Sequence, residues 1–145
     1  MKDIVEHWDS EHGVARCIIH YKTSCGTELN GIGIAECSKE DTEFMSELTG
    51  TVIAEYRAQI DLIRKINRYE IRPAITALKH VYCTMQHSKR YNPKSYEAIR
   101  LKKELAHLLD ELEENKTAIK NIQEDLATYI QRKDDFYQSI KKGQK

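Results

Sequence analysis

Residues 101–140 read LKKELAHLLDELEENKTAIKNIQEDLATYIQRKDDFYQSI, and their apolar side chains recur alternately every four and every three residues. This spacing places one apolar stripe along a single face of a helix, and the stripe must pack against a partner to leave water. Charged residues fill the spans between, so the opposite face is predicted to be solvated. Twelve positions form the stripe, and ten of them are apolar: Leu101, Leu105, Leu108, Leu112, Asn115, Ile119, Ile122, Leu126, Tyr129, Lys133, Phe136 and Ile140.

The stripe is wider than a two-stranded coiled coil requires. If Leu105 takes heptad position a, then Leu109, Ile130 and Tyr137 take position e beside the a and d seam. An apolar face of this width is typical of a bundle of three or more helices. We therefore expect a homodimer in which helices of two copies pack together, with these residues at the contact: Leu105, Leu108, Leu112, Ile119, Ile122, Leu126, Tyr129, Ile130 and Phe136.

Two polar residues interrupt the seam, Asn115 and Lys133. Polar groups at such positions lower stability but can fix the register and the number of partners. The alternative interpretation is that both lie where the seam frays or opens to solvent.

The N-terminal segment has the pattern of strands. Strands are expected over Asp3–Trp8, Val14–Lys22 and Asn30–Cys37, because these runs are apolar or β-branched and turn residues separate them. An antiparallel three-stranded meander is the simplest arrangement. Gly31 and Gly33 leave one face of the third strand nearly bare, which permits close approach of another backbone.

The rest of the chain predicts two helical arms, at residues 42–87 and 95–142. Ser38–Asp41 has the pattern of a helix N-terminus, and the apolar phase slips near Arg72-Pro73, where a kink or break is expected. Residues 88–94 form a loop, and Ser95 caps the second arm. The predicted fold is α+β, mainly α: a β-meander (1–37) followed by a long antiparallel helical hairpin or coiled coil (38–145), together one structural unit.

The charge of the chain is zero overall but is segregated along the sequence. Residues 35–56 carry a net charge of −5, whereas residues 57–103 carry twelve Lys and Arg against three acidic residues, a net of +9. A basic middle segment suits an acidic protein surface, nucleic acid, or the acidic segment of a second copy. The first ten residues have no signal-peptide pattern and no run is long enough to span a membrane, so a cytoplasmic protein with reduced cysteines and no membrane partner is expected.

No set of residues has the spacing of an active site or a metal centre. His80, Cys83 and His87 share a helical face, but a fourth ligand and a CxxC pair are missing from the sequence around them, so we expect no metal. Cys17 is expected to be a small core thiol. Gly31-Ile32-Gly33 lacks the third glycine of a nucleotide loop. We therefore expect no catalytic residue, no cofactor and no enzymatic activity.

The loop between the arms and the start of the second arm combine cations with aromatic rings. Such a combination suits nucleic acid, whose phosphates bind cations and whose bases stack on aromatic rings. It also suits a protein partner, because interfaces draw much of their energy from Tyr and Arg. The alternative is a solvated connector. The predicted partner-binding residues are Lys89, Arg90, Tyr91, Lys94, Tyr96 and Arg100.

A stretch of about thirty residues resembles small uncharacterised proteins of Gram-positive bacteriophages. It comprises Gly31-Ile-Gly-Ile-Ala-Glu-Cys37, Asp41-x-x-Phe44, Gly50 and Ala54-Glu-Tyr-Arg57-Ala58. The family pattern is a strand ending Gly-x-Ala-x-Cys, an Asp/Phe helix entry, a glycine within the helix and an Ala-x-x-Arg-Ala run. The resemblance implies a phage origin. Small non-enzymatic phage proteins often bind host machinery, including defence systems such as CRISPR nucleases.

Taken with the apolar stripe, these features favour a non-enzymatic interaction protein that binds and inhibits or modulates a host or immune macromolecule. One alternative is a nucleic-acid-binding accessory protein that uses the loop between the arms. A second alternative is a protein that captures a small signalling nucleotide, with Tyr and Arg side chains forming a pocket between two copies.

Overall fold

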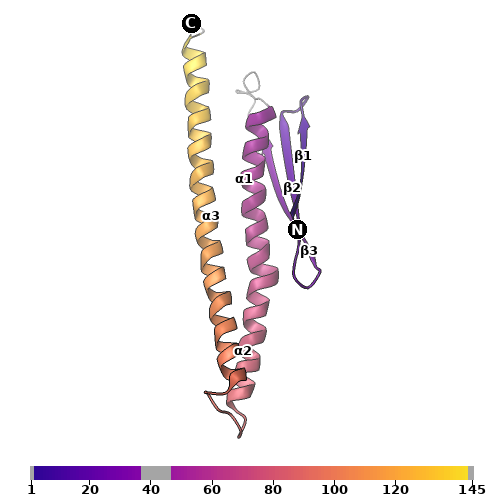
Figure 1. The fold of residues 1–145 in the computed structure, drawn as a ribbon. Coiled ribbons are helices and arrows are strands. Elements are labelled where there is room, and N and C mark those ends of the chain that lie inside the picture. Colours follow the sequence, from indigo (N-terminus) through magenta and orange to yellow (C-terminus); the bar gives the residue numbers. More distant parts are fainter. Residues whose placement is uncertain (1, 37–46, 144–145) are drawn as a thin grey trace. The chain divides into compact units, whose positions relative to one another are not determined.

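The computed structural model describes residues 2–36 and 47–143. Three strands come first, followed by a nearly continuous helical arm and then one long helix (Figure 1). The fold class is therefore α+β and mainly α, as the sequence predicts. The elements are β1 (Lys2–Asp9), β2 (Val14–Lys22), β3 (Glu28–Glu36), α1 (Glu47–Ile66), the π-helix η2 (Asn67–Ile71), α2 (Arg72–Gln86) and α3 (Tyr96–Gly143).

The strands form the predicted antiparallel meander in the order β1-β2-β3. The connections turn at Gly13 and Gly26, whose φ angles of 62° and 88° are conformations that glycine adopts without strain. The register pairs Ile4 with Ile19, and Ile19 with Gly31. Side chains of alternate residues therefore share one face, which we call the inner face of the sheet because it lies against α1. The expected helix start between Ser38 and Glu43 lies outside the described residues.

Gly31 and Gly33 allow the close backbone approach that the sequence predicts. A Cβ atom on Gly33 would collide with the backbone of Ala54 and Ala58, and one on Gly31 would collide with Ala58 and Leu62. Ala54 and Ala58 are fully buried. Strand β3 and helix α1 are thus in near contact through their main chains, and this contact fixes where α1 crosses the sheet.

The phase slip in the first arm is absorbed by a π-turn, and the chain stays helical through it. Residues 67–71 form η2, and the N–H of Arg72 donates to the carbonyl of Asn67, five residues earlier. One such bond inserts an extra residue into the turn and rotates the apolar face that follows. Pro73 stands in the first turn of α2, where its missing N–H matters least.

The loop between the arms lies where the sequence predicts it. Helix α2 ends at Gln86, and α3 begins at Tyr96. The N–H of Ala98 donates to the Ser95 hydroxyl at 3.2 Å, so Ser95 is the N-cap of α3. The Asn92 side chain accepts the N–H of Lys94 at 2.9 Å and stabilises the turn before the cap.

The chain forms two compact units. The first comprises Met1–Lys65 and Ile119–Lys145, and the second comprises Ile66–Ala118. The first unit therefore holds the sheet, nearly all of α1 and the second half of α3, and the second holds η2, α2, the loop and the first half of α3. Both divisions fall inside helical segments, and the predicted boundary between residues 37 and 38 lies outside the described residues.

The first arm and α3 run antiparallel in the second unit, and they are also in contact in the first unit. In the second unit, Tyr82 lies beside Lys102, and Asn67 bonds to Asn115. In the first unit, the Tyr56 and Tyr129 rings lie 6.3 Å apart. Within the second unit, residues earlier in the first arm therefore contact residues later in α3. Within the described residues, no helix has both the length and the apolar character needed to span a bilayer.

Candidate interaction surfaces

The apolar stripe of α3 is only half covered in the single chain. In both units its residues lie against the first arm, yet eleven of the twelve positions are half-buried and none is fully buried. Phe136 is 61% exposed. Among the e positions, Leu109 is 39% exposed, Ile130 is half-buried and Tyr137 is buried. The predicted oligomerisation residues therefore keep apolar surface that the chain itself does not cover.

The first polar interruption, Asn115, is paired within the chain. Its amide donates to the side-chain oxygen of Asn67 at 2.8 Å. Asn67 is the first residue of the π-helix η2 and is 6% exposed. This bond joins the two arms of the second unit, as expected from the interpretation in which Asn115 fixes the register.

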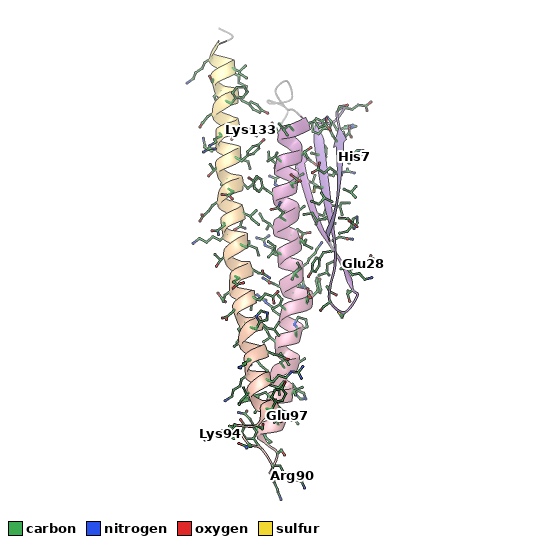
Figure 2. All side chains as sticks on the ribbon, in the orientation of Figure 1. His7, Glu28, Arg90, Lys94, Glu97 and Lys133 are labelled. Carbon is green, nitrogen blue, oxygen red and sulfur yellow. The ribbon has the colours of Figure 1, made fainter. Side chains whose placement is uncertain are left out.

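The second polar interruption, Lys133, finds partners for its charge on its own helix. Its ammonium lies 3.2 Å from the Asp134 carboxylate and 5.5 Å from the centre of the Tyr137 ring. Figure 2 shows Lys133 on α3 in the first unit. The long aliphatic stem can cover apolar surface while the charge stays at the rim.

The loop between α2 and α3 presents the predicted cations to solvent. Lys89, Arg90 and Lys94 are exposed, and Figure 2 shows Arg90 at the end of this loop. Within the described residues, none of these three side chains makes an ion pair. Tyr96 is 74% exposed. Arg100 pairs with Glu104 at 3.0 Å on the surface of α3.

Tyr91 differs from the other predicted contact residues, because it belongs to a small aromatic cluster. Its hydroxyl lies 3.1 Å from that of Tyr82, and the two rings meet edge to face at 6.4 Å. The hydrogen bond lowers the pKa of Tyr82 and raises the pKa of Tyr91. Lys102 lies 5.8 Å from the Tyr82 ring. The Tyr91–Tyr82 contact joins the loop to α2, and the Lys102–Tyr82 contact joins α2 to α3.

The His80, Cys83 and His87 face does not assemble into a ligand cluster. His87 Nδ1 lies 2.7 Å from the Cys83 carbonyl, and Cys83 is exposed. Across residues 2–36 and 47–143, no group of three His, Cys, Asp or Glu side chains is arranged to hold a metal ion.

The inner face of the sheet carries an acidic contact that sequence patterns do not reveal. Partial burial raises the pKa of Glu6 on β1, and so do the hydrogen bond and the negative charge of Glu55 on α1. Cys17, on the neighbouring strand, is fully buried as predicted for a core thiol. Burial, followed by the charges of Glu6 and Glu55, raises the pKa of Cys17 to about 11, so its thiol stays protonated and unreactive.

The outer face of the sheet carries exposed apolar side chains. Val5, Ile18 and Ile32 lie opposite one another on the three strands, and Ile34 extends this row. Val5 is 53% exposed and Ile32 is 47% exposed. An apolar row across a solvent-facing sheet is a candidate contact surface. The alternation of apolar residues on both faces of β2 was visible in the sequence but did not indicate which face α1 would leave open.

No protein family, curated protein or solved structure matches this chain.

Proposed function

We propose that this chain is a non-enzymatic interaction protein that acts stoichiometrically and assembles as a homodimer through α3. The observation that supports this proposal is the half-covered stripe of α3. A chain that used α3 only as a core helix would gain more stability by covering these positions completely, because each buried Leu or Ile side chain contributes about 1.5–3 kcal/mol.

The pattern along α3 also supports a specific contact. The stripe repeats over almost the whole helix, from Leu101 to Ile140, and polar residues cover the other side. A second copy that presents the same stripe would complete a helical bundle with closed two-fold symmetry. Because Asn115 is already paired within the chain, the contact between copies would rest on the apolar positions.

Light scattering of purified protein tests the assembly. We expect the mass of a dimer at tens of micromolar, and we expect Leu126→Asp to shift the mass toward that of the monomer because a charge would enter the seam. Ala127→Asp is the matched control, since Ala127 is the neighbouring residue and is exposed. A monomer in the wild-type protein would refute the assembly. Circular dichroism separates dissociation from unfolding in the Leu126→Asp variant.

We further propose that the target is a host or defence macromolecule of the cell that a phage infects. The support is the resemblance of residues 31–58 to small phage proteins, together with exposed cations and apolar surface. The test is recovery of the tagged chain from host lysate, with and without nuclease. A protein that co-purifies after nuclease treatment at fixed stoichiometry supports the proposal, and recovery of nucleic acid alone contradicts it.

Nucleic acid binding by the loop is the second candidate function. It is favoured by the exposure of Lys89, Arg90 and Lys94 beside the exposed Tyr96 ring. If it holds, affinity for single-stranded nucleic acid should fall steeply with salt, because each neutralised phosphate releases counterions. Arg90→Glu should weaken binding, whereas Arg132→Glu, an exposed charge reversal in the first unit, should not. Equal affinities for the two variants would exclude the loop as the contact.

A further inference from the structure

Side chains of helix α1 bond to the main chain of one edge strand of the sheet, β3. β3 is one edge strand, and α1 side chains occupy its outward main-chain groups. The guanidinium of Arg57 donates to the carbonyl of Ile34 at 2.7 Å, and the ammonium of Lys65 donates to the carbonyl of Asn30 at 2.7 Å. The N–H of Ile32 donates to the carboxylate of Asp61 at 2.8 Å.

These three side chains stand four residues apart on one row of α1, and they bond to alternate residues of β3. Lys65 and Asp61 also form an ion pair at 2.9 Å, which holds both in place. No further strand can pair with β3 without displacing them. Proteins commonly block an edge strand in ways such as this, because open edges recruit other strands.

The opposite edge, β1, has no such protection among the described residues. β1 pairs with β2 along all eight of its residues, and β2 is its only partner in the sheet. Its apolar side chains are among the more exposed in the chain, with Ile4 at 54%. Figure 2 shows His7 on this strand, and His7 lies on the outer face together with Asp3 and Val5.

We propose that the free edge of β1 pairs antiparallel with β1 of a second copy of this chain. A two-fold axis perpendicular to the sheet keeps like faces together, so the pairing must centre on one residue. Centred on Val5, it places Val5 against its own copy and places Asp3 against His7 of the mate, twice. A neutral or charged imidazole can donate to a carboxylate, so both outer-face pairs are favourable.

The charges on β1 favour this register over the one centred on Glu6. Centring the pair on Glu6 would place Glu6 against itself and Asp3 against Asp9, and like charges directly opposite each other are destabilising. The pairing on Val5 also joins the apolar rows on the outer faces of the two sheets. The row Val5, Ile18 and Ile32 of one copy would then be continuous with the same row of its mate. Pairing along one eight-residue edge buries less surface than a standard protein interface, which buries about 1,600 Å². We therefore expect the contact to depend on concentration.

Disulfide trapping tests this pairing and does not depend on the α3 assembly. Side chains directly opposite in antiparallel strands have Cβ atoms about 4.5–5.5 Å apart, which is close enough for a disulfide after a small adjustment. Val5→Cys is made in a chain whose other accessible cysteines, Cys25 and Cys83, together with Cys37, are replaced by serine. Ile32→Cys in the same background is the control, because it has similar exposure on the same face but lies on the protected strand.

Under mild oxidation, Val5→Cys should give a disulfide-linked dimer whose yield rises with protein concentration and exceeds that of Ile32→Cys severalfold. Circular dichroism confirms that both variants are folded. The unmodified chain gives an independent readout: amide hydrogen exchange in β1 should slow as concentration rises, whereas exchange in β3 should not change. Equal trapping of the two cysteines, or exchange in β1 that is independent of concentration, would overturn the pairing.

Discussion

Removing the amide of Asn115 should weaken the second unit by leaving a buried acceptor without its partner. Asn115 donates to Asn67 at 2.8 Å, and Asn67 is 6% exposed. In the described part of the chain, no buried side-chain nitrogen or oxygen lacks a hydrogen-bond partner. Asn115→Ala would therefore create a defect of a kind that this structure otherwise avoids.

The expected loss in the free energy of unfolding is the difference between two opposing contributions. An unsatisfied buried polar group costs about 1–3 kcal/mol. Alanine gains up to about 0.7 kcal/mol of helix propensity over asparagine. The net loss in the free energy of unfolding should be about 0.3–3 kcal/mol for Asn115→Ala. Asn67→Ala also loses the bond, but the group that it leaves behind is only half-buried and can reach water, so the loss should be smaller.

A double-mutant cycle measures the bond itself. Urea unfolding of the two single variants and the double variant, followed by circular dichroism at 222 nm, should give a coupling energy of about 0.5–2 kcal/mol. Asn121→Ala on the exposed surface of α3 is the matched control, and it should be neutral or slightly stabilising. A coupling energy below about 0.3 kcal/mol would show that the two amides act independently, and the register argument would fail.

Three further outcomes follow from contacts in the structure. Gly33→Ala should lower stability by about 1–3 kcal/mol or more in urea unfolding, because the new methyl group would meet the Ala54 backbone, which cannot move aside as a side chain can. Glu6→Gln should stabilise the chain at neutral pH, because the pKa of Glu6 is raised and its ionised form is disfavoured in the folded chain. The protonated Glu6 side chain stabilises the fold in acid, and this stabilisation is lost as the pH rises above about 4.5. The increase in thermal stability of Glu6→Gln over the wild-type protein should therefore grow with pH and vanish in acid. Ser95→Ala should cost about 1 kcal/mol in the same assay, since it removes the N-cap of α3.

Local sequence chemistry is enough to predict the elements of this fold. Alternating β-branched residues and turn residues place the three strands, and β2 begins and ends at the predicted residues, Val14 and Lys22. The heptad spacing predicts α3, and Ser95 predicts its start. These features depend on residues that are close in sequence, so each can be interpreted without knowing the rest of the chain.

Features that join distant residues could not be predicted in the same way. The larger apolar side chains Val52, Tyr56 and Ile60 recur every four residues along α1, yet the row that packs on the sheet is Ala54, Ala58 and Leu62. Small residues carry a weak hydrophobic signal, and their role becomes visible only with the glycines of β3 opposite them. For the same reason, the partner of Asn115 was not predictable. Asn67 lies 48 positions away, and a π-turn brings it into the seam.

Helix α1 uses three rows of side chains for three different contacts within the first unit. One row packs on the glycines of β3, a second bonds to the edge of β3, and a third, which includes Tyr56, meets α3. These contacts leave α1 little free surface for a partner. Apolar surface that remains exposed in this unit therefore belongs to β1, the outer face of the sheet, the stripe of α3 and Leu48 in the first turn of α1. A partner of the first unit, whether a second copy or another molecule, should bind to these surfaces, and substitutions in the three rows of α1 should act through folding rather than through direct contact.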